Sequence, residues 1–212
     1  MSLNLFVLGA TGNTGAHIVD LALARGHSVT AFVRSPQKIT RKDAALTVMA
    51  GDPLRVDPLA RAMPGHDAVL SALGPPAREA FSASTLLSEG AATTVAAMNT
   101  AGVGRLAIVS AAVLFPEKGL KFAFFRWLLQ RHARDLLAME AVVQATSLEW
   151  TIARPPRLTK TAEETYRSER DALPGHAATA SFRAVAAFLL DCVERGEHLR
   201  EIVGVARSAR AA

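Results

Sequence analysis

Residues 9–15 read Gly9-Ala10-Thr11-Gly12-Asn13-Thr14-Gly15. An apolar run over 3–8 precedes them and predicts a strand, and apolar residues at helical spacing follow over 12–25. A glycine triplet between a strand and a helix is the context in which such a loop binds the pyrophosphate of a dinucleotide. The alternative is a glycine-rich turn that binds no ligand.

The three glycines have separate roles in this interpretation. Gly9 permits a tight turn out of the strand, and Gly12 lets backbone N–H groups approach the phosphates. Gly15 allows the helix to pack close to the sheet, and the helix N-terminus favours negative charge. Polar groups at the rim of the loop are then expected from Thr11, Asn13 and Thr14.

Strand and helix patterns alternate outward from this loop. Strands are expected over 28–33, 46–49, 68–73, 106–110 and 150–153, and helices over 53–63, 84–101 and 133–145. A strand over 165–170, a helix over 182–195 and a strand over 202–205 follow. The alternation predicts an α/β fold, a doubly wound parallel sheet of Rossmann type, in a single domain over 1–212.

Composition narrows the class of protein. The chain has 212 residues, a net charge of +5 and a single cysteine, Cys192, which lies in an apolar helical pattern and is expected to be buried. One thiol suits a reducing cytoplasm, no secretion signal is visible, and no apolar run reaches the roughly 18 residues of a membrane span. No metal-ligand spacing links the histidines, and no nucleic-acid motif accompanies the charge. We expect a cytoplasmic monomer or weak homodimer with no bound metal and no nucleic-acid partner.

The end of the second strand favours one dinucleotide. NAD-preferring sites place an acidic residue there, but this chain reads Val33-Arg34-Ser35. Arg34 has the fork geometry for a 2′-phosphate, with Lys38 close by, so NADPH is expected and NADH is less favoured. The alternative is an ordinary exposed arginine. Asp52 is expected to bond the adenine amino group, to cap a helix starting near residue 53, or to do both; Leu73 and Gly74 should form the far wall.

Several segments together resemble a known family. They are the glycine loop, the Val33-Arg34-Ser35 strand end, Gly51-Asp52, Ser71-Ala72-Leu73-Gly74, the run over 102–110 and Trp150-Thr151-Ile152-Ala153-Arg154-Pro155-Pro156. The chain resembles the atypical short-chain dehydrogenases of the NAD(P)H-binding, NmrA-like group over nearly its whole length. Residues 88–98 are similar to the flavin reductase subgroup that includes biliverdin reductase B. The resemblance implies that Arg78 lies over the cofactor, that Ser110 and Ala111 flank the nicotinamide, and that Pro155 and Pro156 border it.

The catalytic pair of ordinary short-chain dehydrogenases, Tyr-x-x-x-Lys, is missing. The only tyrosine is Tyr166, and the resemblance places His132 and Leu136 near the two positions. A flavin, quinone or similar planar acceptor spreads the charge that hydride brings and collects its proton from water, so it needs no positioned acid. Ser110 is then a hydrogen-bond donor to the substrate, or a serine that caps a strand. His132 is a general acid or a surface residue.

Two regions are expected on the substrate side, 111–135 and 155–181. The first contains an aromatic and basic segment over 115–129, which is a lid on a planar substrate, a contact to membrane or partner, or a helix packed on the core. Glu140 departs from the flavin reductase subgroup, which carries a histidine there, and this argues against tetrapyrrole reduction.

Three functions fit these patterns to different degrees. The first is an NADPH-dependent reductase of a planar conjugated acceptor. The second is an NmrA-type regulatory protein that senses NAD(P) without turnover. A nucleotide-sugar isomerase or dehydratase fits less well, because such enzymes keep the Tyr-Lys pair and a larger C-terminal region.

Overall fold

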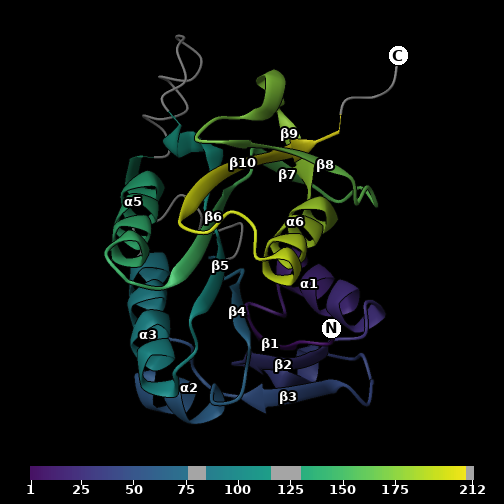
Figure 1. The fold of residues 1–212 in the computed structure, drawn as a ribbon, viewed down its shortest axis with the longest axis vertical. Helices are drawn as coiled ribbons and strands as arrows, with labels where there is room; N and C mark the ends of the chain where they lie inside the picture. Colours follow the sequence, from purple (N-terminus) through teal and green to yellow (C-terminus); the bar gives the residue numbers. More distant parts are fainter. Residues whose placement is uncertain (76–84, 116–129, 209–212) are drawn as a thin grey trace.

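The main sheet has a nearly all-parallel arrangement (Figure 1). The computed structural model describes residues 1–75, 85–115 and 130–208, with the side chains of 130–132 and 176 left out. Within these residues the sheet has eight strands. From one edge to the other they are β3 (Leu46–Ala50), β2 (Ser28–Val33), β1 (Asn4–Leu8), β4 (Ala68–Ser71), β5 (Arg105–Val109), β6 (Glu149–Arg154), β10 (Glu201–Arg207) and β8 (Tyr166–Arg170).

The strand order reverses next to β1. From β1 the chain moves outward through β2 to β3 and then returns to β4 on the other side of β1. All neighbouring pairs are parallel except β10 with β8, which is antiparallel. In open sheets of this kind, ligands bind at the carboxyl ends of the strands where the order reverses.

Helices cover both faces of the sheet (Figure 1). One face carries α1 (Asn13–Ala24) and α6 (Phe182–Arg195), and the other carries α2 (Val56–Ala62), α3 (Leu86–Ala101) and α5 (Gln130–Gln144). Each layer has its own apolar core. The first is built around residues such as Ile18, Val185 and Phe188, and the second around Phe6, Leu106 and Met139. This arrangement confirms the doubly wound α/β fold.

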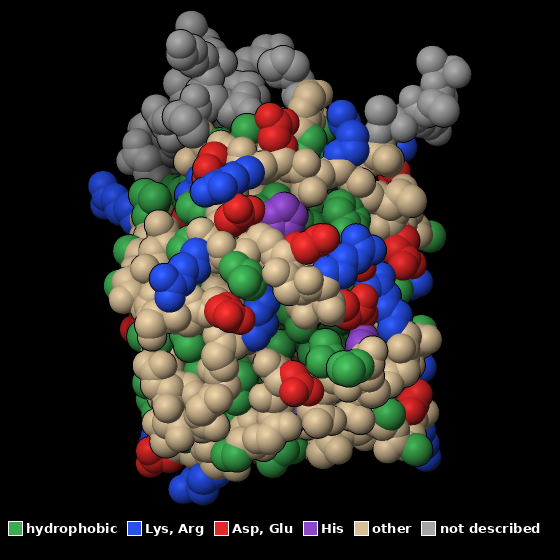
Figure 2. Space-filling view, viewed as in Figure 1, with side chains coloured by type: hydrophobic (Ala, Val, Ile, Leu, Met, Phe, Trp, Pro, Cys, Tyr) green, Lys and Arg blue, Asp and Glu red, His purple; other side chains and the backbone are tan. Residues whose placement is uncertain are grey.

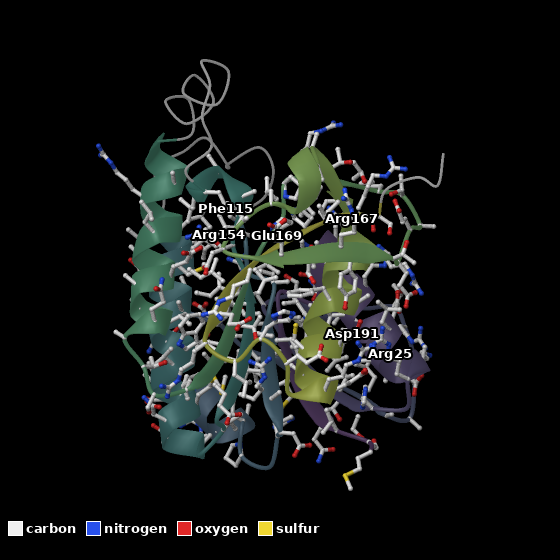
Figure 3. All side chains as sticks on the ribbon, turned by 45° about the horizontal axis from the view of Figure 1, so that its top comes forward. Arg25, Phe115, Arg154, Arg167, Glu169 and Asp191 are labelled. Atoms are coloured by element: carbon white, nitrogen blue, oxygen red, sulfur yellow. The ribbon has the colours of Figure 1, made fainter. Side chains whose placement is uncertain are left out.

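The helices α1 and α6 are joined at their ends by ion pairs. Arg25, directly after α1, lies 2.7 Å from Asp191 and 3.0 Å from Glu194 of α6. Figure 3 shows Arg25 and Asp191 next to each other. Asp191 also accepts a hydrogen bond from the Tyr166 hydroxyl of β8 at 2.5 Å. The one tyrosine therefore has a structural partner.

A second, two-stranded parallel sheet joins β7 (Arg157–Thr159) and β9 (Thr179–Ser181). The sequence patterns did not predict it, because each strand has only three residues, which is too short for a strand pattern to be recognised. Short 3₁₀ helices also occur: η1 (Pro36–Lys38), η3 (Ala112–Leu114) and η4 (Pro174–His176). Ser181, at the end of β9, caps α6 by accepting a hydrogen bond from the Ala184 N–H at 2.8 Å.

Two predicted element boundaries were wrong near the glycine loop. The helix expected from residue 53 begins at Val56 with Arg55 as its N-cap. Asp52 closes the preceding turn, since its carboxylate accepts from the Leu54 N–H at 3.0 Å and its carbonyl from the Arg55 N–H at 3.1 Å. The fourth strand ends at Ser71 and not at residue 73.

Charge is spread over the described surface in the view of Figure 2. Lys and Arg side chains on this face stand beside Asp and Glu side chains. The net charge of +5 is therefore not gathered into one continuous basic patch on this face. None of the described helices is long and apolar enough to cross a membrane.

Candidate functional site: a cleft at the carboxyl ends of the strands

A cleft of ≈ 510 Å³ lies along the carboxyl ends of β1, β2, β4 and β5. This volume is typical of a small-molecule site. The described residues that line it are Gly9, Thr11, Gly12, Asn13, Thr14, Phe32, Val33, Arg34, Lys38, Pro53, Ala72, Leu73, Gly74, Pro75, Leu87, Val109, Ser110, Leu136, Leu158 and Phe182. The position is the one that the reversal of strand order predicts.

The glycine loop is packed too tightly for side chains at two of its positions. Gly9 has a φ of +78°, and a Cβ there would lie 2.4 Å from the Ala72 carbonyl oxygen. A Cβ on Gly15 would lie 2.1 Å from the Gly9 carbonyl oxygen. That oxygen also accepts the Gly12 N–H at 2.9 Å. The loop therefore turns back on itself between α1 and the end of β4, as its sequence predicts.

The first turn of α1 forms part of the cleft wall. The helix begins at Asn13, its N-cap is Gly12, no side chain caps it, and no acidic residue lies in its first turn. The unpaired N–H groups of a helix start carry partial positive charge. Because Gly12, Asn13 and Thr14 all line the cleft, this end of the helix is available to an anionic ligand.

Basic side chains stand at the same end of the cleft. Arg34 and Lys38 line it and are exposed, and no Asp or Glu is found among the described lining residues. Arg34 directly follows β2, and Lys38 ends η1. The helix start and the two cations together make this end complementary to phosphate groups.

The other end of the cleft is largely apolar. It is bordered by Leu73, two residues past β4, and by Val109 at the end of β5. Leu136 on α5, Leu158 on β7 and Phe182 at the start of α6 complete it. Ser110 is the polar side chain among them. Among the described lining residues of the whole cleft there is no Asp, Glu, His, Cys or Tyr, the side chains that most often serve as general acids.

Ser110 is held from behind by a buried ion pair. Its hydroxyl donates to Glu140 Oε1 at 2.5 Å. Arg154, the last residue of β6, donates to the same carboxylate through Nε at 2.9 Å and Nη2 at 2.6 Å. Ser110, Glu140 and Arg154 are 6 %, 1 % and 9 % exposed. The Arg154 guanidinium also lies 4.8 Å from the centre of the Phe115 ring, and Figure 3 shows these two side chains side by side.

Most residues predicted to contact a dinucleotide lie in the cleft wall. They are Gly9, Thr11, Gly12, Asn13, Thr14, Arg34, Lys38, Leu73, Gly74 and Ser110. Gly15 packs behind the loop. Asp52 does not line the cleft, although its neighbour Pro53 does, and it builds the turn described above.

Other predicted positions are outside this wall or outside the described residues. Ala111, Pro155 and Pro156 are not among the lining residues; Pro155 is buried, and its carbonyl accepts from the Ala112 N–H at 2.9 Å. Arg78, the segment 116–129 and the side chain of His132 lie outside the described part of the chain. Contacts of these residues with a ligand stay predictions.

The sequence patterns did not predict the ion pair between Glu140 and Arg154. A signal for it exists in α5. Glu140 shares a helix face with the buried residues Leu136, Met139 and Val143, and a carboxylate on an apolar face needs a buried partner. Asp135 gives a second such case, because it accepts from the backbone N–H groups of Leu87 and Ser88 at 3.0 Å and so fixes the start of α3 beside the cleft.

The strand order and the cleft define the class of Rossmann-type α/β proteins. A family model described as NAD(P)H-binding matches residues 9–195. The chain therefore belongs to the NAD(P)H-binding family.

Solved structures of other proteins have the same fold. A Rossmann-fold NAD(P)-binding family protein from Shigella flexneri is 25% identical with a TM-score of 0.77, over 100% of this chain and 99% of its own. A short-chain dehydrogenase/reductase from Veillonella parvula in complex with NADP is 19% identical (TM-score 0.78; 100% and 98% covered). A "putative NADH-flavin reductase" from Streptococcus pneumoniae is 22% identical (TM-score 0.76; 98% and 100% covered).

Proposed function

We propose that this protein is an NADPH-dependent oxidoreductase that delivers hydride to a planar conjugated acceptor such as a flavin or a quinone. One observation carries the proposal. The described wall of the cleft has a helix start and two cations at one end, an apolar surface with Ser110 at the other, and no Asp, Glu, His, Cys or Tyr along it.

The residues present fit a phosphorylated dinucleotide. The glycine loop has no room for side chains at Gly9 and Gly15, and the α1 start has no cap of its own. These features would hold the pyrophosphate. Arg34 and Lys38 would hold a 2′-phosphate, and the absence of a carboxylate after β2 favours NADPH over NADH. A structural relative is described in complex with NADP, whereas another is named for NADH.

The polarity of the inner cleft supports a conjugated acceptor. A reduced nicotinamide, when bound, supplies a hydride. Reduction of a simple ketone would then need a proton donor, and the described residues at the apolar end of the cleft offer only Ser110, whose proton is already donated to Glu140. A flavin or quinone takes its proton from water, so positioning by apolar walls is sufficient.

The same lack of a proton donor also fits an NmrA-type protein that senses NAD(P) without turnover. Titration of the purified protein with NADPH and NADH, followed by addition of riboflavin phosphate and a simple quinone, separates the two functions. We expect NADPH to bind more tightly and the nicotinamide absorbance to fall only when protein and acceptor are both present. Tight binding with no absorbance change for any acceptor would contradict the reductase and leave the sensor.

A further inference from the structure

Ser110 belongs to both the cleft and the buried ion pair behind it. It lines the cleft one residue past β5, and its backbone N–H donates to the Ala153 carbonyl at 2.7 Å, which fixes the main chain there. Its hydroxyl is directed at Glu140 Oε1, 2.5 Å away. What Ser110 can offer to a ligand depends on which group, the Ser110 hydroxyl or the Glu140 carboxyl, donates the proton of this hydrogen bond.

The contacts of Glu140 identify the donor of the Ser110–Glu140 hydrogen bond. Both of its oxygens accept from Arg154, at 2.9 Å and 2.6 Å, in the paired geometry that a guanidinium makes with an ionised carboxylate. A guanidinium has only donors, and an ionised carboxylate has only acceptors. Glu140 therefore has no proton to give, and the Ser110 hydroxyl must be the donor. Stacking on Phe115 and near-complete burial hold the Arg154 side chain in this position.

A serine hydroxyl has one proton and two lone pairs. Once the proton is donated to Glu140, only lone pairs remain for a ligand in the cleft. We infer that Glu140 and Arg154 are positioning residues that fix Ser110 as a hydrogen-bond acceptor. If the cleft binds a dinucleotide as proposed above, Ser110 selects a ligand group that carries an N–H. This reverses the sequence-based expectation that Ser110 donates to the substrate.

Candidate ligands differ in the hydrogen-bonding groups along their edges. A nicotinamide carboxamide carries an NH₂ group and the isoalloxazine ring of a flavin carries a ring N–H, whereas a simple quinone presents only carbonyl oxygens. A carbonyl placed against the Ser110 lone pairs would lose its water without gaining a bond, which is costly in an apolar setting. The N–H that faces Ser110 comes from the cofactor or from the acceptor, and two experiments distinguish these sources.

The cofactor arm is a binding measurement and needs no turnover. Calorimetry compares NADP⁺ with its 3-acetylpyridine analogue, in which a methyl group replaces the carboxamide NH₂. If the cofactor supplies the N–H, the wild-type protein binds NADP⁺ roughly 3- to 10-fold more tightly, the worth of one net hydrogen bond, and Ser110→Ala loses this preference. Ser147→Ala, an exposed serine outside the cleft wall, is the matched control and should keep it.

The acceptor arm compares a flavin with its N3-methylated form in steady-state reduction. If the acceptor supplies the N–H, methylation raises KM roughly 3- to 10-fold in the wild-type protein and changes little in Ser110→Ala. A preference that depends on Ser110 in either arm supports the inference. Equal behaviour of wild type and Ser110→Ala in both arms, or a wild-type preference for the ligands without N–H, overturns it.

A third measurement separates this inference from the proposed function. Thermal unfolding of Ser110→Ala, Glu140→Met and the double variant tests the hydrogen bond in the absence of any ligand, because methionine has no oxygen to accept the Ser110 proton. Because the two groups share one bond, the double variant should lose clearly less than the sum of the two Tm changes. Simple addition would overturn the inference even if NADPH binds. Failure of every dinucleotide to bind would overturn the proposed function, while a non-additive result would still support the fixed Ser110 hydroxyl.

Discussion

Arg34 is the residue at which cofactor preference can be tested most directly. It stands directly after β2, exposed, on the cleft wall. Arg34→Glu should weaken NADPH binding by roughly 10- to 100-fold, because a charge-assisted contact to the 2′-phosphate is lost and a repulsive one is gained. NADH binding should change much less. Parallel fluorescence titrations with the two dinucleotides measure both effects.

A matched control for this substitution is Arg61→Glu, which makes the same charge change on an exposed helix position outside the cleft wall. It should leave both dissociation constants within about twofold, since this exposed charge lies outside the cleft wall and is screened by salt. Equal losses of NADPH and NADH in Arg34→Glu would refute the role of Arg34 in binding the 2′-phosphate.

At the scale of elements, the junction of β1 and α1 depends on close backbone packing. Gly15→Ala would place a methyl group 2.1 Å from the Gly9 carbonyl oxygen, and neither backbone can move independently. We expect a loss of roughly 1–3 kcal/mol of stability and a strong loss of dinucleotide binding, because the loop must shift away from α1. Urea unfolding and calorimetric titration measure the two effects.

The control for the glycine loop is Gly104→Ala. Gly104 lies just before β5, where an added Cβ would meet nothing within 4 Å and no left-handed φ is present. This variant should match wild type in binding and stability. Unchanged NADPH binding in Gly15→Ala would show that the tight loop is a structural turn without a role in binding.

At the scale of the whole molecule, stability should depend on alkaline pH through Cys192. The residue is 1 % exposed, and burial raises its thiol pKa from an ordinary 9.0 to about 12. The folded state thus keeps the proton that the unfolded state releases. The contribution of this thiol to stability should be constant below pH 9 and fall above it by up to about 1.4 kcal/mol per pH unit.

Urea unfolding between pH 7 and 10.5 measures this dependence. Cys192→Ala should flatten it between pH 9 and 10. Above pH 10 the Tyr166 hydroxyl, whose pKa is also raised by burial and by its bond to Asp191, adds to the loss in the same direction. A thiol reagent at pH 8 should leave the native protein unmodified and react fully in guanidinium chloride. Rapid labelling of the native protein would contradict the buried thiol.

The features that the sequence predicted well are those encoded locally. The glycine loop, Arg34 and the alternation of strands and helices each depend on neighbours in the chain, so spacing alone located them. The buried Arg105 could not be found in this way. Its guanidinium donates to the carbonyl oxygens of Glu149, Cys192 and Glu197, and burial lowers its pKa. Such partners, like those of Glu140, are brought together only by the tertiary fold.

The order of the last strands has a consequence for how the chain is made. Among the described elements, β8 pairs only with β10, and β10 lies between β8 and β6. During synthesis β8 leaves the ribosome first and has no strand to join until α6 and β10 have followed. The nascent chain therefore carries an unpaired sheet edge at β6 for this interval, and such edges invite intermolecular pairing. Slower translation of residues 171–200, or a chaperone present while they are synthesised, should change the yield of folded protein. The same intervention earlier in the chain should change this yield less.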